Sequence, residues 1–363
     1  MNVLLAAGGT GGHLFPAAAL AAALRARGID VDLATDERAL KYGGEFPARA
    51  IHAIPSGTPT RAGLVAKAEA AARLGLGVAV AARLLWRLKP AVVVGFGGYP
   101  TVPPLVAASL LRIPSILHEQ NAVLGRANRF LAGRVGVIAA GFPDLGGVPA
   151  ALRAKLRYAG NPVRPAVLAA AATPYPGFAD GRLRVLATGG SQGAHVMAEV
   201  VPAALARLSA EERARLTLTL QARGEDLVQA QAECRRLGFA AEIAEFFPDL
   251  PARIAAAHLV VARAGASTVS ELAVIGRPSI LVPYPHALDQ DQAANAALLA
   301  EAGAAEVVRQ SEFTPEALAA RLRAALADPE ALKAKAEAAR RAGVPDAAER
   351  LAAIVAEVAA GTR

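Results

Sequence analysis

The sequence contains almost no cysteine, a modest share of charged residues and no long apolar run. Cys234 is the one cysteine in 363 residues, which excludes an intrachain disulfide and favours a reducing compartment. The longest apolar stretch, at 74–82, is far shorter than the roughly 20 residues that a membrane-spanning helix needs. The N-terminus has no basic start and its first apolar run soon ends in glycines, unlike a signal peptide. We therefore expect a cytosolic protein, which can still lie on a membrane surface.

The composition is that of a folded, basic protein. Hydrophobic residues make up 54% of the chain and charged residues 19%, a balance typical of globular proteins. A chain of 363 residues is too long for one ordinary core, so we expect two domains. The net charge of +8 favours anionic partners, which include phosphates, nucleic acid and an anionic membrane surface.

Short apolar runs alternate with Ala- and Leu-rich helical segments along almost the whole chain. Such alternation predicts an α/β protein with doubly wound parallel sheets that helices cover on both faces. The expected strands lie at 3–7, 29–34, 50–54, 91–94, 115–118 and 135–139, and again at 183–188, 216–221, 241–244, 259–262, 279–282 and 305–308.

A proline-rich break separates the two sets of strands. It runs from Gly160 to Pro165 and continues at 173–177, where prolines remove backbone donors and fix φ. We place the domain boundary here, with domains at 1–160 and 161–341. The helical segment 342–363 can pack on either domain, of which we favour the first.

Glycine-rich turns follow three of the predicted strands. Gly8–Gly12 precedes His13 and a predicted helix, and Gly189–Ala194 repeats this arrangement in the second half. Backbone N–H groups at such a helix start suit an anion or a nucleotide. Neither turn fits the dinucleotide pattern, because Leu14 stands where the first would need its last glycine. A third turn, Gly95–Pro100, is either a strained loop or a further anion-binding rim.

Polar clusters follow other predicted strands. His118–Asn121 is no zinc motif, because Ala122 replaces the second histidine, and we expect these four side chains to face a ligand. After the strand at 259–262, Ser267 or Thr268 either caps a helix or holds a diphosphate, with Glu271 reaching a ribose. The acids Asp289 and Asp291 are better explained by a helix dipole than by a metal.

The segment 61–89 is basic and apolar and contains the only tryptophan. It suits either the interface of an anionic bilayer or a helix that covers a sheet and exposes a basic face. For the first interpretation, the membrane-facing candidates are Leu76, Val80, Arg83, Trp86 and Arg87.

Six motifs, in this order, closely resemble the MurG family of bacterial peptidoglycan N-acetylglucosaminyltransferases: GGTGGHLFPA, GFGGYPTVPP, HEQNAVLGRAN, GNPVR, GGSQGA and RAGASTVSE. The resemblance covers nearly the whole chain and implies a GT-B fold of two Rossmann-like domains that face a cleft. It also implies inverting transfer of GlcNAc from UDP-GlcNAc to the MurNAc 4-hydroxyl of lipid I, at the cytoplasmic face of the cell membrane. The implied products are lipid II and UDP, and no essential metal or other cofactor is expected.

The resemblance also implies roles for individual residues. Glu271 would hold the ribose and Phe247 would read uracil through its backbone, while Asn121, Ala266 and Gln292 would touch GlcNAc. The acceptor side would be lined by Gly97, Gly98 and Tyr99 with His13 and Glu119. The full UDP-GlcNAc-binding set is Thr10, Gly11, Gly12, Asn121, Arg164, Gly190, Ser191, Gln192, Gly193, Phe247, Ala266, Ser267, Thr268, Glu271 and Gln292.

His13 is the leading candidate for the catalytic base and Glu119 is its rival. A histidine at a helix N-terminus is expected to stay neutral and able to accept a proton. The chain departs from the family at Asp291, where Gln or His is common, and at Ala264, where Ser is common. The alternatives are an enzyme like the UDP-GlcNAc 2-epimerases and a non-catalytic UDP-sugar-binding membrane adaptor. An NAD-dependent oxidoreductase is disfavoured by the broken fingerprint.

Overall fold

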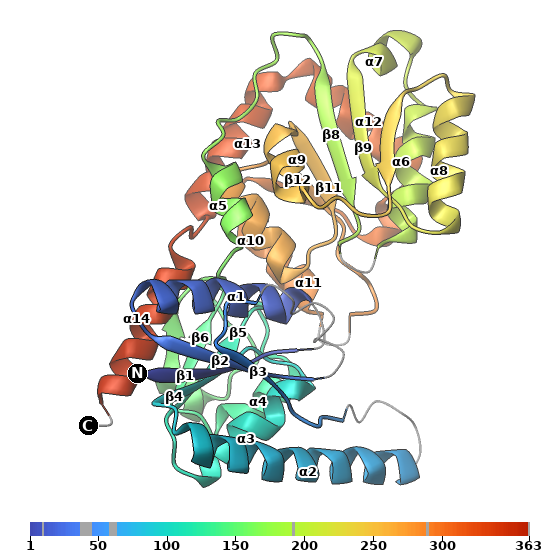
Figure 1. The fold of residues 1–363 in the computed structure, drawn as a ribbon. Helices are drawn as coiled ribbons and strands as arrows, with labels where there is room; N and C mark the ends of the chain where they lie inside the picture. The colour runs from blue at the N-terminus through green and yellow to red at the C-terminus, as the bar shows by residue number, and fades with distance from the viewer. Residues whose placement is uncertain (9–10, 37–45, 58–63, 191–192, 288–289, 362–363) are drawn as a thin grey trace. The chain divides into compact units, whose positions relative to one another are not determined.

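The chain folds into two compact units, each built on a parallel sheet (Figure 1). The computed structural model describes residues 1–8, 11–36, 46–57, 64–190, 193–287 and 290–361. The first unit comprises residues 1–164 and 345–363, and the second comprises residues 165–344. These bounds differ by a few residues from those predicted at the proline-rich break.

The seven-stranded sheet of the first unit has the order β3-β2-β1-β4-β5-β6-β7, and every neighbouring pair is parallel. The strand order reverses between β1 and β4, so the loops after these two strands begin side by side at the carboxyl edge. The strands are β1 Asn2–Ala6, β2 Asp30–Thr35, β3 Ala50–Ala53, β4 Val92–Gly95, β5 Ser115–Glu119, β6 Val137–Ala140 and β7 Leu156–Tyr158.

Helices cover both faces of this sheet. Alternate residues of a strand point to opposite faces, so Val3 and Leu5 pack with α1 and α14, whereas Leu4 and Ala6 pack with α2 and α3. The C-terminal helix α14 also forms an ion pair of 2.6 Å through Glu349 with Arg27, the residue directly after α1. The helices are α1 Gly11–Ala26, α2 Leu64–Leu88, α3 Val102–Leu110, α4 Arg126–Ala132 and α14 Ala347–Ala360, with short 3-10 turns η2 Tyr99–Thr101 and η3 Ala150–Lys155.

The second unit repeats the same architecture with six strands in the order β10-β9-β8-β11-β12-β13. Its order reverses between β8 and β11. The strands are β8 Leu183–Thr188, β9 Leu216–Gln221, β10 Ala241–Ala244, β11 Leu259–Ala262, β12 Ser279–Leu281 and β13 Ala305–Val307. The helices are α5 Pro165–Ala171, α6 His195–Leu205, α7 Ala210–Ala214, α8 Glu225–Arg236, α9 Leu250–Ala256, α10 Ala266–Ile275, α11 Asp291–Glu301, α12 Pro315–Ala327 and α13 Pro329–Ala342, with the short 3-10 turn η4 Gln310–Glu312.

The predicted fold class is therefore confirmed, and twelve of the strands lie where the sequence predicts them to within two residues. The thirteenth, β7, was not predicted. It is a three-residue edge strand whose residues are only partly buried or exposed, so it has no apolar run for a pattern to detect.

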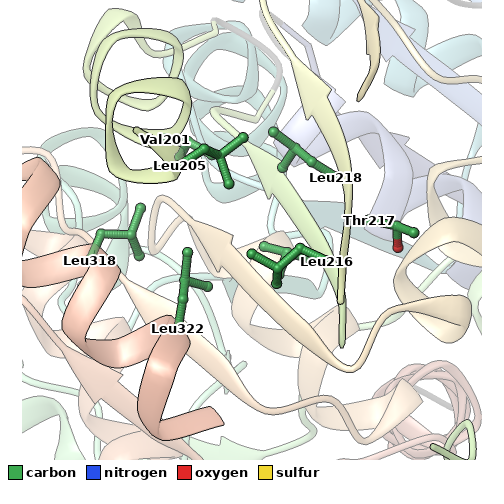
Figure 2. A pocket seen from close by; sticks show the side chains of 8 residues that line it. Val201, Leu205, Leu216, Thr217, Leu218, Leu318 and Leu322 are labelled. Carbon is green, nitrogen blue, oxygen red and sulfur yellow. The ribbon is translucent and has the colours of Figure 1, made fainter. Parts of the chain in front are cut away.

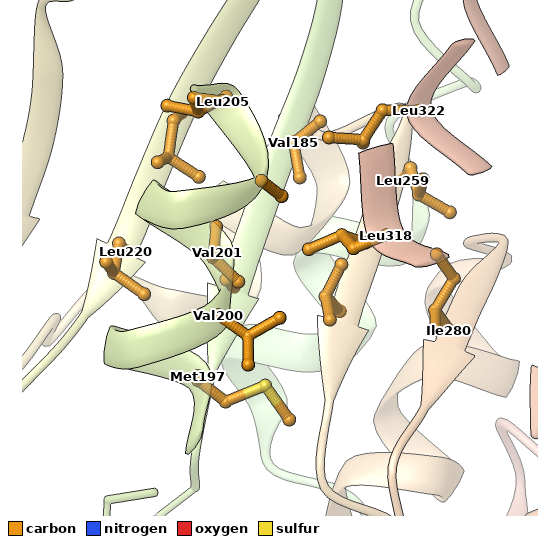
Figure 3. Close-up of a cluster of buried hydrophobic side chains, with 14 of the residues drawn as sticks. Val185, Met197, Val200, Val201, Leu205, Leu220, Leu259, Ile280, Leu318 and Leu322 are labelled. Carbon is orange, nitrogen blue, oxygen red and sulfur yellow. The ribbon is translucent and has the colours of Figure 1, made fainter. Parts of the chain in front are cut away.

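The core of the second unit lies between its sheet and the helices α6 and α12 (Figure 3). Leu318 and Leu322 of α12 lie beside Val201 and Leu205 of α6 on the same face of the sheet. A small apolar cavity remains where these side chains meet Leu216 and Leu218 of β9 (Figure 2).

We predict that Leu318→Ala destabilises the protein by about 3 kcal/mol, because it enlarges a cavity that the surrounding helices cannot close. Leu318 is only 1% exposed. The matched control is Leu168→Ala in α5 of the same unit, where the leucine is 40% exposed and the cost should stay below about 1 kcal/mol. Urea unfolding of both variants measures the difference, and equal midpoints would contradict this account of the core.

Candidate active site

Glycines that follow two strands of the first unit lie close together where its strand order reverses. Gly8 comes directly after β1, and Gly97–Gly98 follows β4, which pairs with β1 from Val3 to Ala6. The Cβ position of Gly98 lies 3.7 Å from Gly8 O. Ligands of doubly wound sheets bind at such a reversal, beyond the carboxyl ends of the strands. The topology thus brings together two turns that are about 85 residues apart in the sequence.

His13 is the third residue of α1, and its ring packs against the second turn. The position that a Cβ would take at Gly97 lies 3.4 Å from His13 Cδ2, and the one at Gly98 lies 3.5 Å from His13 Cε1. Both glycines have positive φ angles, +85° and +73°, which side chains rarely adopt. The backbone angles therefore favour glycine at both positions, and the turn lies within van der Waals reach of the imidazole.

The surroundings of His13 keep its imidazole neutral. Burial lowers the pKa of His13 to about 4, although a hydrogen bond from the ring to the Gly8 carbonyl acts in the opposite direction. The neutral state agrees with the expectation from the sequence, but its main cause is removal from water rather than the helix N-terminus. A neutral imidazole with one nitrogen donating to a carbonyl carries an acceptor nitrogen on its other side.

Glu119, at the end of β5, is held by four hydrogen bonds. Its Oε1 accepts from the backbone N and the Nδ2 of Asn121 at 3.0 and 3.3 Å, and its Oε2 accepts from Gly125 N at 3.0 Å and Asn128 Nδ2 at 2.7 Å. The carboxyl group is 2% exposed, and burial raises its pKa. These contacts make Glu119 the anchor of the loop 121–128.

Asn128 of α4 is a site residue that sequence reasoning missed. It is buried, donates to Glu119, and its Nδ2 lies 3.0 Å from the Cβ position of Gly97. It therefore links the anchor of the loop to the turn that supports His13. The signal was present, because Asn128 closes the motif HEQNAVLGRAN, but nothing in its local pattern distinguished it from a helical surface residue.

The expectation that all four residues of His118–Asn121 face a ligand is wrong. His118 is fully buried and its Nε2 donates to Gly160 O at 3.0 Å, while Nδ1 accepts from Gln120 Nε2 at 2.9 Å. Burial lowers the pKa of His118 to about 4. Gln120 is also buried, so Asn121 is the member of the four that reaches the surface. Tyr99, the first residue of η2, is partly exposed beside the turn.

The second unit has a comparable arrangement where β8 meets β11. A Cβ at Gly189 would lie 2.2 Å from the Ala194 backbone N, so this turn closes too tightly for any side chain there. Gly193 N donates to Gly190 O at 3.1 Å, and both residues have positive φ angles. Ser191 and Gln192, like Thr10 of the first unit, lie outside the described residues.

Helix α10 begins directly after β11, next to this turn. Its N-cap is Gly265, so Ser267 and Thr268 are the second and third helical residues and neither is the cap that the sequence allowed. Both side chains are partly exposed at the first helical turn, where backbone N–H groups have no partner within the helix. Glu271 lies further along the helix and is 7% exposed.

Other predicted residues of this unit surround the same edge. Gln292 Oε1 accepts from the backbone N of Ala264 at 3.3 Å and of Tyr284 at 3.0 Å, so its amide nitrogen is the group able to donate to a sugar. Ala266 opens α10. Phe247 is buried beneath the Arg253 guanidinium, which lies 4.2 Å from its ring centre. Within the described ranges, no three His, Cys, Asp or Glu side chains lie where they could bind one metal ion.

Helix α2 of the first unit covers the sheet and exposes a basic and apolar outer side. Ala81, Leu84 and Leu85 are buried in the core, so the helix does cover the sheet. Its outer side exposes Leu76 at 57% and Trp86 at 73%. Val80 is partly exposed, and Arg83 and Arg87 are exposed on this helix as well.

Basic charge is concentrated in the unit that carries α2. The first unit contains 21 Lys and Arg against 11 Asp and Glu, an excess of 10, whereas the second contains 18 against 20. Among the described residues, no helix combines the length and apolar character that crossing a bilayer requires.

Comparison with known proteins connects this geometry to one family. The model of the glycosyltransferase family 28 N-terminal domain matches residues 3–139, and that of the C-terminal domain matches residues 184–351. A UDP-N-acetylglucosamine–N-acetylmuramyl-(pentapeptide) pyrophosphoryl-undecaprenol N-acetylglucosamine transferase of Methylobacterium sp. (strain 4-46) is 63% identical, covering 99% of this chain and 98% of the relative. The transferase of the same description from Brucella canis is 55% identical, covering 99% and 94%. The chain belongs to the MurG family of N-acetylglucosaminyltransferases.

Solved structures agree with this assignment. The crystal structure of Acinetobacter baumannii MurG superposes with a TM-score of 0.79 at 30% identity, covering 98% of this chain and 99% of that one. A UDP-GlcNAc 2-epimerase from Neisseria meningitidis gives a TM-score of 0.69 at 14% identity over 99% of both chains, a likeness that shows the fold alone. The predicted MurG family, GT-B fold and transferase activity are thus confirmed, and the epimerase and adaptor alternatives are not favoured.

We predict that Gly97→Ala lowers kcat at least tenfold. A methyl group at φ +85° costs roughly 1–2 kcal/mol of backbone strain, would be tight against Asn128 Nδ2 at 3.0 Å and would meet the His13 ring at 3.4 Å. Gly238→Ala is the matched control, because its φ of +62° imposes a similar strain with no atom within 4 Å of the new methyl. Steady-state kinetics of the two variants separate the effects, and a normal kcat for Gly97→Ala would show that the close packing on His13 is not needed.

Proposed function

We propose that the chain moves GlcNAc from UDP-GlcNAc to the 4-hydroxyl of the MurNAc unit of lipid I, with inversion at the anomeric carbon. Lipid II and UDP are the products. The observation that carries this proposal is the packing of His13 against Gly97 and Gly98 at the reversal point of one sheet, together with a glycine turn and a helix start at the reversal point of the other sheet. Names of full-length relatives describe the same transfer.

The second unit is assigned the nucleotide sugar. The turn 189–194 and the first turn of α10 offer backbone N–H groups to the diphosphate, assisted by the hydroxyls of Ser267 and Thr268. Glu271 is assigned to the ribose, because its carboxylate can accept a hydrogen bond from each of the two ribose hydroxyls. Gln292 then donates to the GlcNAc. The assignments of Ser191, Gln192 and the backbone of Phe247 rest on the resemblance of their motifs.

The first unit is assigned the acceptor and two contacts to the donor. Backbone N–H groups near Gly11 and Gly12 are suited to the acceptor's diphosphate, with Tyr99 beside them. Asn121, the exposed member of its motif, is assigned to GlcNAc, and Arg164 to the phosphates of the donor. UDP leaves as an anion, and donors aimed at its developing charge lower the barrier without a metal or other cofactor.

His13 is the base in this scheme. The acceptor hydroxyl must lose a proton as its oxygen attacks the anomeric carbon, and a neutral imidazole accepts that proton. Glu119 is the weaker candidate, because both of its oxygens already accept hydrogen bonds that order the loop 121–128. The raised pKa of Glu119 favours proton uptake, but it does not release either oxygen from these hydrogen bonds.

Membrane association is a separate part of the proposal. The acceptor is linked to a lipid, and the excess of basic charge lies in the unit to which we assign it. We assign Leu76, Val80, Arg83, Trp86 and Arg87 of α2 to an anionic membrane surface at the cytoplasmic side of the cell membrane. Trp suits the boundary between headgroups and acyl chains, and arginines suit anionic headgroups.

We predict that His13→Ala lowers kcat about 100-fold or more while the affinity for UDP-GlcNAc changes little. UDP release is measured in the presence and in the absence of a lipid I analogue as the acceptor, with EDTA present. Donor binding is measured by calorimetry. Because the base must be neutral and the pKa of His13 is about 4, the wild-type kcat should stay level down to about pH 5.5 and fall below it.

Several results would contradict this scheme. Near-normal turnover of His13→Ala would remove His13 from the role of base. A loss of wild-type kcat centred near pH 6.5 would mean that the working group has an ordinary histidine pKa. Epimerised sugar, or UDP release that does not depend on the acceptor, would refute the transfer itself.

For the membrane surface, we predict that Arg83→Ala with Trp86→Ala weakens binding to vesicles rich in anionic lipid by about tenfold, because a charge and an interfacial anchor are both lost. Binding of the unmodified protein should also weaken as salt rises. Val228→Ala with Arg235→Ala, an exposed pair on α8 of the second unit, is the control and should bind normally. Unchanged vesicle binding of the α2 variant in a cosedimentation assay would place the surface elsewhere.

A further inference from the structure

Two polar side chains are buried at the carboxyl ends of neighbouring strands in the second unit. Thr188 is the last residue of β8 and Gln221 is the last residue of β9, and they are 2% and 5% exposed. Thr188 Oγ1 donates to Gln221 Oε1 at 2.6 Å. A buried polar group is costly unless it is hydrogen-bonded, so each of these side chains depends on its partners.

The pair is connected to the glycine turn that follows β8. Gly190 N donates to Thr188 Oγ1 at 3.2 Å, so the hydroxyl accepts from the turn and gives its one proton to Gln221. Gly190 O in turn accepts from Gly193 N at 3.1 Å. The Gly190 N–H is thereby used to fix the shape of the turn to which we assign the diphosphate.

The other end of the pair reaches the segment that follows β10. Gln221 Nε2 donates to Glu245 O at 3.1 Å, and because a carbonyl only accepts, this bond settles the orientation of the Gln221 amide. The strand β10 lies at the edge of the sheet beside β9 and ends at Ala244, which is opposite Gln221. The glutamine side chain thus continues the hydrogen bonding one residue beyond the strand, directly before Phe246 and Phe247.

The same segment is held to the end of β9 by two further hydrogen bonds. Ala222 N donates to Ala244 O at 3.1 Å, and Gly224 N donates to Glu245 Oε1 at 3.2 Å. These two bonds join the segment to the loop after β9. The bond from Gln221 differs from them, because through Thr188 it also joins the segment to the glycine turn.

We propose that Gln221 is a positioning residue for the donor, which fixes the turn 189–194 and the segment 245–247 relative to one another. This inference rests on the diphosphate and uracil contacts assigned to those two segments under Proposed function. Uracil and diphosphate belong to one ligand, so a site in which both segments are already placed loses less free energy to ordering when UDP binds. The whole chain of hydrogen bonds lies in the second unit, which is one compact body.

Packing alone does not explain a polar pair at this place. The preceding residues of the two strands, Ala187 and Leu220, belong to the hydrophobic core of the unit. An apolar pair would also fill the space at the ends of the strands, but it would bond neither Gly190 N nor Glu245 O. The polar pair serves both backbone groups at once.

The test measures donor affinity in Gln221→Leu and Thr188→Val, alone and combined. Each single change should raise the Kd for UDP and the KM for UDP-GlcNAc about five- to tenfold, because the two segments must then be ordered when the donor binds. With a water-soluble acceptor analogue, kcat should change less than about twofold. The double variant should exceed the larger single effect by less than about twofold, because one chain of bonds is broken only once.

Conservative and unrelated changes provide the controls. Thr188→Ser keeps the hydroxyl and should keep the wild-type KM. Thr219→Val alters another threonine of β9, two residues before Gln221 and partly exposed, and should also keep it. Leu318→Ala, which we expect to destabilise the same unit through its core, should lower the Tm without raising the KM. If Gln221→Leu does not fold, the comparison of Thr188→Val with Thr188→Ser decides the question.

Three results would overturn the inference, and they are distinguishable. An unchanged KM for folded Gln221→Leu, with a lowered Tm, would show that Gln221 only stabilises the unit. Independent effects of Gln221→Leu and Thr188→Val, which multiply in the double variant, would show that the two side chains do not act as one link. Glu271→Ala removes the carboxylate assigned to the ribose. If it leaves the Kd for UDP unchanged, the donor assignment itself fails, and the role of Gln221 fails with it.

Discussion

The reversal of strand order in each sheet is the constraint on which the candidate site depends. Between β1 and β4, and again between β8 and β11, neighbouring strands send their following loops to opposite faces of the sheet. The edge between them is open, and helix N-termini point toward it. The backbone N–H groups there are available only if the turns stay narrow. Glycines at Gly97 and Gly189, where any side chain would strain or block the turn, satisfy that condition.

Around this open edge, the first unit uses buried polar groups as scaffolding. Burying the Glu119 carboxylate would be costly without partners, and its four donors offset that cost while ordering the loop that presents Asn121. His118 is likewise buried between Gly160 O and the Gln120 amide. The motif His118–Asn121 thus contains three supporting residues and one residue, Asn121, that reaches the surface.

This division explains how much of the site the sequence could predict. Apolar runs and glycines are patterns of residues close together in the sequence, and they predict the strands, the turns and the fold class. Partners distant in sequence do not appear in such patterns. The edge strand β7, the burial of His118 and the part played by Asn128 all depend on them. His13 shows the difference most clearly: its neutral state was predicted, but its cause is the burial that the turn after β4 contributes.

We assign different chemistry to the similar glycine turns of the two units. A diphosphate is stabilised by fixed positive potential, which helix N-termini supply without a titrating group. Proton removal needs a group that is neutral before the reaction, and a positive potential alone cannot provide it. In the first unit, burial lowers the pKa of His13, which packs beside Gly98, so its neutral imidazole is suited to that task.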